Sequence, residues 1–468
     1  MRLDPIVAPG RVAGHVHTIS GGAAFAPTMT YEGMRASKCS SCTIKEDMSN
    51  YWTPQLYVKF KNSTFLPVPQ IGDPEDTTGG MAVYYLQRRG NDPNEKLHAF
   101  PEGFRMLAGD TSARSFGNNS AAKAVSYSCL GGPGLPETNN MPNFNCPGGL
   151  RAQIFFPACW NGRDLDTPDH KSHMAYPVGS EYNTGACPPD FPVHMISLFF
   201  EVLYDTAPFL DQWDGDQHPF VFSQGDTTGY GYHGDFLNGW DVPTLQRAVD
   251  TCTDDSGLVE RCSAVTQFTY EECLSCRIHE GVKETNDGLL TKLPGCNPVT
   301  HGPHPSAPGQ CTDNVALGIR KTNYVDLTTT KQWSYVGCGR DNIADRAFPG
   351  PSYSRAAATV EMCVDFCAGQ GYTYAGLEYS RECFCANALR PEYAPRDGFM
   401  GNCVAKCAGN PAQTCGGSAA MSIYRACGGG ECRNNEQFGA APVMQARGLI
   451  VDAPEQQVRS HAREIFGA

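Results

Sequence analysis

The chain contains 468 residues, of which 41% are hydrophobic and 18% are charged, with 50 glycines and 34 prolines. Its formal net charge is −13 and it has no basic cluster, which argues against nucleic acid and anionic membrane surfaces as partners. No apolar run approaches the roughly 18 residues that a membrane-spanning helix needs. A prior of about 150 residues per domain suggests two to three domains.

Between about residues 50 and 250, short apolar segments alternate with glycine, proline, asparagine and aspartate. A period of two is typical of strands. The segments with this pattern are PQLYVKFK (54–61), MAVYYLQRR (81–89), AVSYSCL (124–130), AQIFFPACW (152–160), MISLFFEVLYD (195–205) and HPFVFSQG (218–225). The best helical patterns are VPTLQRAVDTC (242–252) and YEECLSCRIHE (270–280). These elements predict a mainly β domain, built as a sandwich, jelly roll or barrel.

The 22 cysteines are spread along nearly the whole chain, as in proteins of oxidising compartments. Two CxxC pairs, Cys39–Cys42 and Cys273–Cys276, could in principle frame a zinc site. They lie more than 200 residues apart, so we favour disulfides. We therefore expect a secreted, extracellular glycoprotein, with acceptor sequons at Asn62 and Asn118. Its first residues, MRLDPIVAPG, lack an apolar signal region, so the implied secretory signal is expected to have been removed.

The cysteines also divide the chain. Twelve fall within the first 311 residues, and we assign 1–330 to the β-rich domain, with a disulfide-rich extension from about residue 252. Eight fall within 338–415, where a small module needs such staples, so a second domain is expected at 335–425. The tail, 426–468, holds one more cysteine pair and is expected to form a short helix capped by Asp452. We expect a monomer.

The second module contains, in order, YVGC, MCVDFC, GYTYAGLEYSRECFCAN and CAGNPAQTCGG. These motifs resemble the WSC domain, an eight-cysteine module named for yeast wall-integrity sensors, with one departure at Ala386, where the family usually has glycine. The resemblance implies binding to polysaccharide, most often in fungal walls, and with it an association with the cell wall. Exposed aromatic rings can stack on sugars, although the same rings could simply form the small core. The rings are those of Tyr372, Tyr374, Tyr379 and Phe384, with Tyr374 and Tyr379 as candidate contacts.

A second resemblance covers roughly residues 3–260. The segments DPIVAPGRVAGHVHTISGG, CWNG, DHKSHMAYP and GDTTGYGYHGDFLNGWD resemble a fungal secreted family catalogued as a domain of unknown function and frequently fused to WSC domains. This resemblance implies membership of a family but no established activity. The chemistry has to be inferred from the residues.

Three segments of the first domain concentrate ionisable side chains. GRVAGHVHTISGGAAF (10–25) places His15 and His17 on one side of an extended strand. CWNGRDLDTPDHKSHMAYP (159–177) carries Asp164, Asp166, Asp169, His170, Lys171 and His173, and SQGDTTGYGYHGDFLNGWD (223–241) carries Asp226, His233 and Asp235. Paired carboxylates beside histidines suit acid–base cleavage of glycosidic bonds. The candidate pair is Asp169 and Asp235, with Glu201 or Asp226 as substitutes.

The remaining candidates support the same chemistry. His170, His173 and His233 could orient the carboxylates, or one of them could act as the base of a lyase. Stacking subsites are expected from Trp160, Trp213, Tyr230 and Trp240. The leading prediction is a secreted enzyme, a glycoside hydrolase or lyase, that cleaves a wall polysaccharide without a required cofactor. The WSC domain would hold it on its substrate by raising the effective concentration.

Two alternatives remain open. Because HxH is a common metal-ligand spacing, His15 and His17 could bind a divalent metal in an oxidative polysaccharide enzyme. A copper oxygenase of that type would want an amino-terminal histidine, whereas fourteen residues precede His15. Alternatively, the chain is a non-catalytic wall-binding protein, since DTPDH fits an Asx-type turn. Whether the three segments meet in space decides among these readings.

Overall fold

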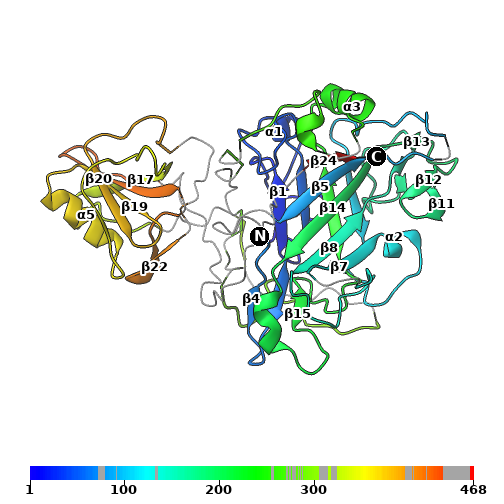
Figure 1. The fold of residues 1–468 in the computed structure, drawn as a ribbon, viewed down its shortest axis with the longest axis horizontal. Coiled ribbons are helices and arrows are strands. Elements are labelled where there is room, and N and C mark those ends of the chain that lie inside the picture. The colour runs from blue at the N-terminus through cyan, green and yellow to red at the C-terminus, as the bar shows by residue number, and fades with distance from the viewer. Residues whose placement is uncertain are drawn as a thin grey trace. The chain divides into compact units, whose positions relative to one another are not determined.

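The structure is a computed structural model that describes residues 1–71, 80–90, 92–131, 135–254, 258–269, 288–304, 315–317, 324–395, 405–417 and 419–435. Isolated residues between these ranges and the backbone of 464–467 are also described. The chain divides into two compact units. The first comprises Met1–Tyr270, Gly281–Gly318 and Ala446–Ala468, and the second comprises Glu271–Glu280 and Ile319–Gln445 (Figure 1).

The first unit is built around two β-sheets, as the alternating segments predict. Within the described residues, one sheet has the order β1 (His17–Gly21), β2 (Asn50–Pro54), β16 (His233–Leu237) and β6 (Arg105–Gly109). The other has the order β24 (Glu464–Gly467), β5 (Met81–Leu86), β14 (Ser197–Tyr204), β8 (Leu150–Phe155) and β7 (Val125–Cys129). All neighbours are antiparallel except β24, which runs parallel to β5. The prediction of a mainly β, disulfide-stapled domain is confirmed.

Aromatic side chains join the inner faces of the two sheets. Tyr51 of β2 stacks on Phe236 of β16, with ring centroids 5.6 Å apart, and meets Phe200 of β14 edge-on at 5.6 Å. The ring centroid of Phe156 lies 4.6 Å from that of Phe200. Because strand side chains alternate, this packing sends every second residue of β16, including His233, to the outer face of the first sheet.

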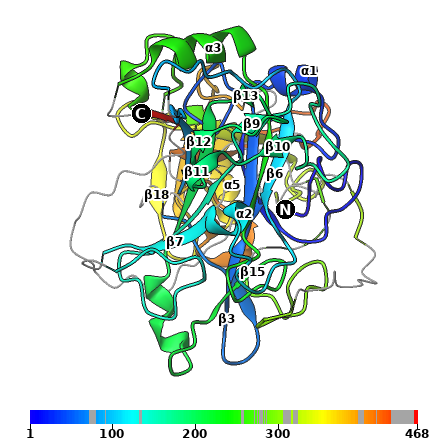
Figure 2. The same ribbon diagram turned by 90° about the vertical axis from the view of Figure 1, so that its right-hand side faces the viewer.

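Smaller elements complete this unit, with α1 and α3 at one end of the sheets and β3 and β15 toward the other (Figures 1 and 2). The minor sheets are β15 (Phe220–Phe222), β3 (Leu56–Lys59) and β4 (Phe65–Pro67); β10 (Met174–Ala175), β9 (Cys159–Trp160) and β13 (Val193–His194); and β11 (Val178–Glu181) with β12 (Thr184–Ala186). The helices are α1 (Tyr31–Arg35), α2 (Ser120–Lys123), η1 (Ala207–Gln212), α3 (Val242–Thr251) and η2 (Val259–Arg261).

The helix predicted at 242–252 is confirmed as α3, in which Asp241 accepts a hydrogen bond from the Thr244 amide as the N-cap. Most of the helix predicted at 270–280 lies outside the described residues. The tail helix expected after Asp452 also lies outside them, except at 464–467, which form strand β24 instead. No helix among the described residues is long and apolar enough to cross a bilayer.

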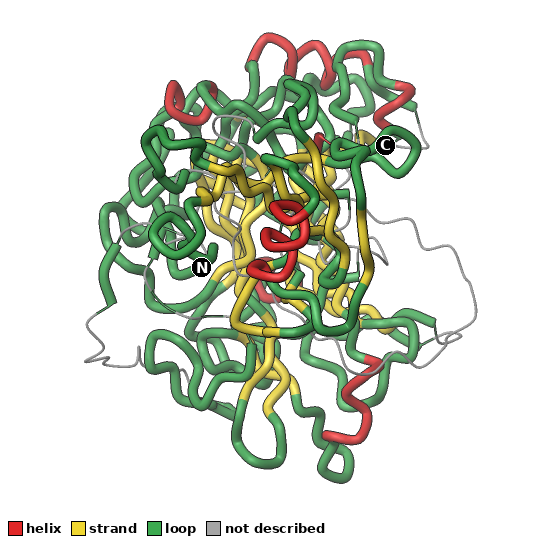
Figure 3. The backbone as a smooth tube through the Cα atoms, turned by 90° about the vertical axis from the view of Figure 1, so that its left-hand side faces the viewer, coloured by secondary structure: helices red, strands yellow, loops and turns green. Residues whose placement is uncertain are grey.

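The second unit has a sheet with the order β17 (Trp333–Arg340), β23 (Ala420–Ala426), β19 (Tyr374–Glu378), β20 (Glu382–Ala386) and β18 (Ser352–Ser354). Helix α5 (Val360–Gly369), the red helix at the centre of Figure 3, lies across this sheet, and β21 (Lys406–Cys407) pairs with β22 (Asn410–Thr414). The helix begins at the cap Thr359 and buries its cysteines against β19 and β20.

Disulfides staple both units, as predicted. The eight cysteines of 338–415 pair only with one another, as Cys338–Cys403, Cys363–Cys383, Cys367–Cys385 and Cys407–Cys415. Further bonds join Cys129–Cys146, Cys159–Cys187, Cys252–Cys262 and Cys427–Cys432. Cys39 and Cys276, one from each CxxC pair, are also disulfide-bonded, which favours disulfides over the zinc alternative. Both sequon asparagines, Asn62 and Asn118, are exposed, and their glycosylation stays a prediction.

Candidate functional site

Three histidines from two of the predicted segments meet on the outer face of the first sheet. His17 begins β1 opposite Pro54 of β2, and the register of β16 on β2 extends this row to His233. His15 precedes His17 by two residues and so lies on the same side. The Nε2 atoms of His15 and His233 are 3.0 Å apart, and the His15 and His17 ring centroids are 4.3 Å apart. One potential ligand atom from each ring lies within 4.8 Å of the other two.

Backbone carbonyls fix the orientation of two of these rings. Nδ1 of His17 lies 3.0 Å from the Leu3 carbonyl oxygen, and Nδ1 of His233 lies 2.9 Å from the Gly231 carbonyl oxygen. A carbonyl oxygen can only accept, so each Nδ1 carries the proton and donates it. In the neutral ring, each Nε2 then carries a lone pair. Nε2 of His17 is buried and has no hydrogen-bond partner among the described residues.

Burial keeps the three rings uncharged at neutral pH. His17 and His233 are each 2% exposed, whereas His15 is half-buried. Desolvation lowers the pKa of all three imidazoles, and charge repulsion within the cluster lowers those of His15 and His17 further. For His233 the pKa falls to about 4. Neutral imidazoles held by carbonyls are the state in which histidine binds a metal ion or accepts a proton.

A carboxyl and an ammonium group adjoin the histidines. Asp235 follows His233 by two residues on the same face of β16, is 1% exposed, and has no hydrogen-bond partner for Oδ2 among the described residues. Burial, and then the nearby Asp4, raise the pKa of Asp235 well above its ordinary value, while Lys171 opposes the shift. The Lys171 ammonium donates to the Gly109 carbonyl oxygen at 2.5 Å.

The loop 159–177 lies along the edge strand β6 and delivers Lys171 to this centre. The Leu107 amide donates to the His170 carbonyl oxygen at 3.0 Å, and the Arg105 amide donates to that of Leu165 at 3.2 Å. The three segments singled out in the sequence therefore converge. The residues that they bring together are His15, His17, His233, Asp235 and Lys171. The charge of Lys171 acts on both Asp235 and His233 without a hydrogen bond between these side chains among the described residues.

The other candidates of this loop hold its shape. Asp169 accepts hydrogen bonds from the Ser172 amide and hydroxyl, at 3.0 and 2.8 Å, and from the Lys171 amide at 3.2 Å. The Ser172 amide is the main reason that the pKa of this carboxyl falls well below its ordinary value. Nδ1 of His170 lies 2.7 Å from Asp166 Oδ1. The Asx-type turn is thus present. Asp169 is an exposed acceptor of this turn, whereas Asp235 is 1% exposed on β16, and the charges that act on Asp235 are those of Asp4 and Lys171.

His173 is also held by the protein itself. Its side chain is fully buried, with Nε2 2.8 Å from the Arg105 carbonyl oxygen and Nδ1 3.0 Å from the Thr167 hydroxyl. Both ring nitrogens therefore have partners inside the fold. A histidine in this position fixes the loop against β6 and does not reach a substrate.

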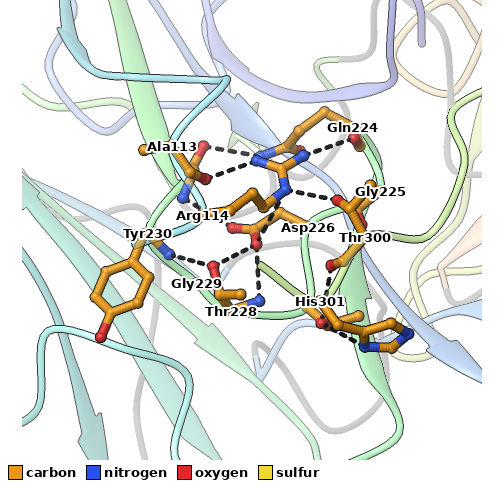
Figure 4. A network of polar contacts seen from close by, with 12 residues as sticks. Ala113, Arg114, Gln224, Gly225, Asp226, Thr228, Gly229, Tyr230, Thr300 and His301 are labelled. Atoms are coloured by element: carbon orange, nitrogen blue, oxygen red, sulfur yellow. Dashed lines mark hydrogen bonds and ion pairs between the residues drawn. The ribbon is translucent and has the colours of Figure 1, made fainter. Parts of the chain in front are cut away.

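Asp226 belongs to a buried structural network, which corrects its assignment as a catalytic substitute. Its side chain and that of Arg114 are both 0% exposed, with Arg114 Nε 3.5 Å from Oδ1 (Figure 4). Oδ1 accepts from the Thr228 amide at 2.7 Å and Oδ2 from the Gly231 amide at 2.8 Å. All its acceptor positions face the protein, so this carboxylate organises the turn that leads into His233.

Glu201 is separated from the centre by the sandwich itself. It lies on β14, where its neighbour Phe200 points inward and Glu201 therefore outward, on the outer face of the other sheet. There it accepts a hydrogen bond from the Tyr84 hydroxyl at 2.6 Å and pairs with Arg151 at 3.2 Å. The sequence shows that side chains alternate along this strand, but it does not show which of the two faces of the strand packs against the other sheet.

The predicted aromatic subsites also separate. Trp240 is 0% exposed and donates from Nε1 to the Tyr85 hydroxyl, so it belongs to the core and cannot stack on a sugar. Trp160, Trp213 and Tyr230 are half-buried. The Tyr230 ring points away from the Asp226 network (Figure 4).

A pocket borders the Lys171 side of the centre. Its volume is about 420 Å³, and Leu107, Gly109 and Lys171 line it together with Tyr176 and Tyr230. Two phenol rings beside a lysine can accommodate a polar, ring-shaped ligand. Lys171 is the member of this site that sequence reasoning left out of its catalytic set, although the lysine stands in the segment that was singled out.

In the second unit, the candidate ring Tyr379 is 43% exposed, whereas Tyr374 is half-buried beside Phe348, at a centroid distance of 5.9 Å. Phe384 is half-buried under the Arg346 guanidinium, 4.6 Å from its centroid. Tyr379 is therefore the aromatic candidate with the most open surface.

Comparisons with known proteins agree with this architecture. The model of the family described as "Domain of unknown function (DUF1996)" matches residues 4–240, and that of the WSC domain matches residues 335–417. A WSC domain-containing protein of Arthroderma benhamiae is 38% identical over 96 residues, 20% of this chain and 10% of that protein. Kremen protein 2 of Mus musculus is 36% identical over 115 residues, 24% of each chain.

Xylosyltransferase oxt of Drosophila pseudoobscura pseudoobscura is 38% identical over 91 residues, which is 19% of this chain and 10% of that enzyme. The chain thus spans between a tenth and a quarter of the length of these curated relatives. The similarity is confined to a module, whereas the DUF1996 model covers half of the chain. The chain therefore belongs to the DUF1996 family and carries a C-terminal WSC domain, a module of the carbohydrate-binding type.

Proposed function

We propose that this protein is a secreted enzyme that cleaves a wall polysaccharide, with the WSC domain holding the glycan and the centre at His15, His17, His233, Asp235 and Lys171 acting on it. The observation that carries the proposal is the convergence of these side chains, from three distant segments, on one sheet face beside a pocket. Clusters of perturbed ionisable groups next to a pocket are typical of active sites.

The centre contains the groups that glycosidic bond cleavage uses. A carboxyl and an ammonium group could donate and accept protons at the leaving oxygen, and the histidine cluster could activate an attacking water. A substrate could reach the centre past the half-buried His15 or through the pocket that Lys171 lines. Asp235 is more deeply buried. Asp4 is the carboxyl whose charge acts on Asp235, and it accepts hydrogen bonds from the Ile6 and Val7 amides. The second proton-transfer group would therefore come from the histidine cluster or from a water held by it.

Replacing Asp235 by asparagine is expected to abolish release of soluble oligosaccharides from wall polysaccharides, because asparagine cannot transfer a proton. The isosteric amide fits the buried position of a carboxyl group whose pKa is raised by burial. The wild type and the variant would be incubated with a panel of wall glycans, and the products read by mass spectrometry. The exposed Asp190 offers a matched Asp190→Asn control that should release products as the wild type does.

Retained binding and unfolding temperature in Asp235→Asn would place the loss in the chemistry. Equal product release by wild type and Asp235→Asn would contradict a role for this carboxyl. If the wild type releases no product from any glycan but still binds one, the protein is a non-catalytic wall-binding protein. That second function is favoured by the WSC domain, a module of the carbohydrate-binding type.

Tyr379→Ala is expected to weaken binding of the full chain to its wall glycan roughly tenfold, about 1.4 kcal/mol, because a stacking ring is lost. Tyr379 is 43% exposed, so part of its ring is open to a sugar, and the unfolding temperature of the variant shows whether the substitution also costs stability. Co-sedimentation with insoluble glycans measures the change. Ile343, 82% exposed in the same unit, provides the control Ile343→Ala, and an equal effect of both substitutions would argue against stacking at Tyr379.

A further inference from the structure

We infer that His15, His17 and His233 form a binding site for one divalent transition-metal ion, held through the three Nε2 atoms. The inference concerns metal binding and goes beyond polysaccharide cleavage. It rests on the relative placement of the nitrogens and on what holds the rings behind them. The site is made by the first unit alone, from β1, the residues just before it, and β16.

The nitrogens that face one another are the ones left with lone pairs. The Leu3 and Gly231 carbonyl oxygens take the Nδ1 protons of His17 and His233, at 3.0 and 2.9 Å. The Nε2 atoms of His15 and His233 approach to 3.0 Å, and all three rings offer a nitrogen within 4.8 Å of the others. Ligating histidines in metal sites are held in this way, with the far ring nitrogen donating to a carbonyl or carboxylate.

A hydrogen bond within the cluster accounts for only part of this arrangement. A proton on Nε2 of His15 could be donated to Nε2 of His233, which would satisfy both. Nε2 of His17 would still be a buried acceptor without a partner among the described residues. Buried polar atoms in native structures nearly always have a partner. A metal ion is a single partner that serves all three nitrogens.

The donor set indicates the class of ion. Three imidazole nitrogens suit zinc and copper, whereas calcium and magnesium prefer oxygen ligands. Three histidines leave a coordination position open, as in catalytic zinc sites. The half-buried His15 marks the side from which water or a small ligand could reach that position. Zinc(II) and copper(II) are therefore the probes for the test.

The experiment uses the full chain with its disulfides formed, stripped by a chelator and titrated with zinc(II) in a calorimeter. We expect one ion per chain, and binding at least about 100-fold weaker in His17→Ala and in His233→Ala, since loss of a ligand exceeds the effect of losing an outer-shell partner. His98 lies outside the cluster and is half-buried, so His98→Ala should bind as the wild type does.

Electron paramagnetic resonance of the copper(II)-loaded wild type provides a readout that needs no variant, because coordinated imidazoles give resolved nitrogen couplings. The inference is overturned if the stripped wild type takes up no stoichiometric ion, if the copper signal lacks nitrogen coupling, or if both alanine variants bind as tightly as the wild type. No glycan is present in these measurements, so their failure and a failure of polysaccharide cleavage are distinguishable.

Discussion

Replacing Arg114 by methionine is expected to destabilise the first unit by about 3–5 kcal/mol, because Asp226 would remain buried without a counter-charge. Both side chains are 0% exposed, and Arg114 Nε lies 3.5 Å from the carboxylate. The guanidinium also donates to the Thr300 hydroxyl at 2.6 Å and to the carbonyl oxygens of Ala113 and Gln224, at 2.7 and 3.1 Å. All these contacts would be lost together (Figure 4).

Calorimetric unfolding of the full chain measures this effect as a fall of roughly 6–20 °C in the transition of the first unit. Arg163 is 81% exposed and pairs with Asp164 at 2.8 Å, so Arg163→Met is the matched control and should leave the transition in place. The double variant Arg114→Met, Asp226→Asn should recover part of the loss, since the amide removes the unpaired charge while its carbonyl oxygen can still accept a hydrogen bond from a backbone amide of the turn. A similar unfolding temperature for wild type and Arg114→Met would show that the pair is not needed for stability.

The same substitution should also disturb the histidine centre. Asp226 accepts from the Gly231 amide, and the Gly231 carbonyl oxygen orients His233 through Nδ1. Only one residue, Tyr232, separates Gly231 from His233, so a shift of this turn moves the imidazole. The network in Figure 4 is therefore a positioning element for the centre as well as a stabilising one.

Local patterns predicted the fold well because its elements are short and regular. Alternation located β5, β7, β8, β14 and β15, and the helical period of 242–252 located α3. The tail illustrates the limit of this reasoning. Residues 464–467 pair as β24 with β5, a partner almost 400 positions earlier in the chain, and no local pattern reveals such a partner. Sheet order and pairing depend on tertiary contacts.

The candidate site could be predicted in part for the same reason. The spacing of His15 with His17, and of His233 with Asp235, places each pair on one strand face, and the structure keeps both pairs. The positions of the other candidates depend on which strands are neighbours in the sheets. Glu201 has a similar local setting, but it lies on the far side of the sandwich, and Trp240 lies in the core. Burial and sheet order separated these residues, and neither can be read from composition.

A buried carboxyl pair in the WSC domain makes its stability dependent on pH. Glu378 and Asp341 share the Arg346 guanidinium, whose Nη1 lies 2.9 Å from Glu378 Oε2, and the Glu378 side chain is 5% exposed. Burial, and then the hydrogen bond and charge of Asp341, raise the pKa of Glu378 from its ordinary 4.5 to about 9, against the opposing effect of Arg346. The folded protein thus retains a proton that the unfolded chain releases.

The sign of the effect follows from this difference in bound protons. Below pH 4.5 both states are protonated and there is no penalty. Above it the unfolded chain binds fewer protons, so stability falls by up to about 1.4 kcal/mol for each pH unit until the folded group also ionises near pH 9. Between pH 5 and pH 7 the expected loss in the second unit is roughly 2–3 kcal/mol.

Glu378→Gln should remove this slope, because glutamine stays neutral and its carbonyl oxygen can still accept a hydrogen bond from Arg346. The variant and the wild type should therefore unfold at similar temperatures at pH 4.5 and diverge at pH 7, with the variant more stable. Scanning calorimetry of the full chain measures both unfolding transitions, and the transition that Glu378→Gln shifts is that of the second unit. Glu392, 57% exposed, supplies the control Glu392→Gln, which should keep the wild-type slope. A wild-type transition that stays level from pH 5 to pH 7 would mean that Arg346 keeps Glu378 ionised, and the pair would then act as an ordinary buried salt bridge.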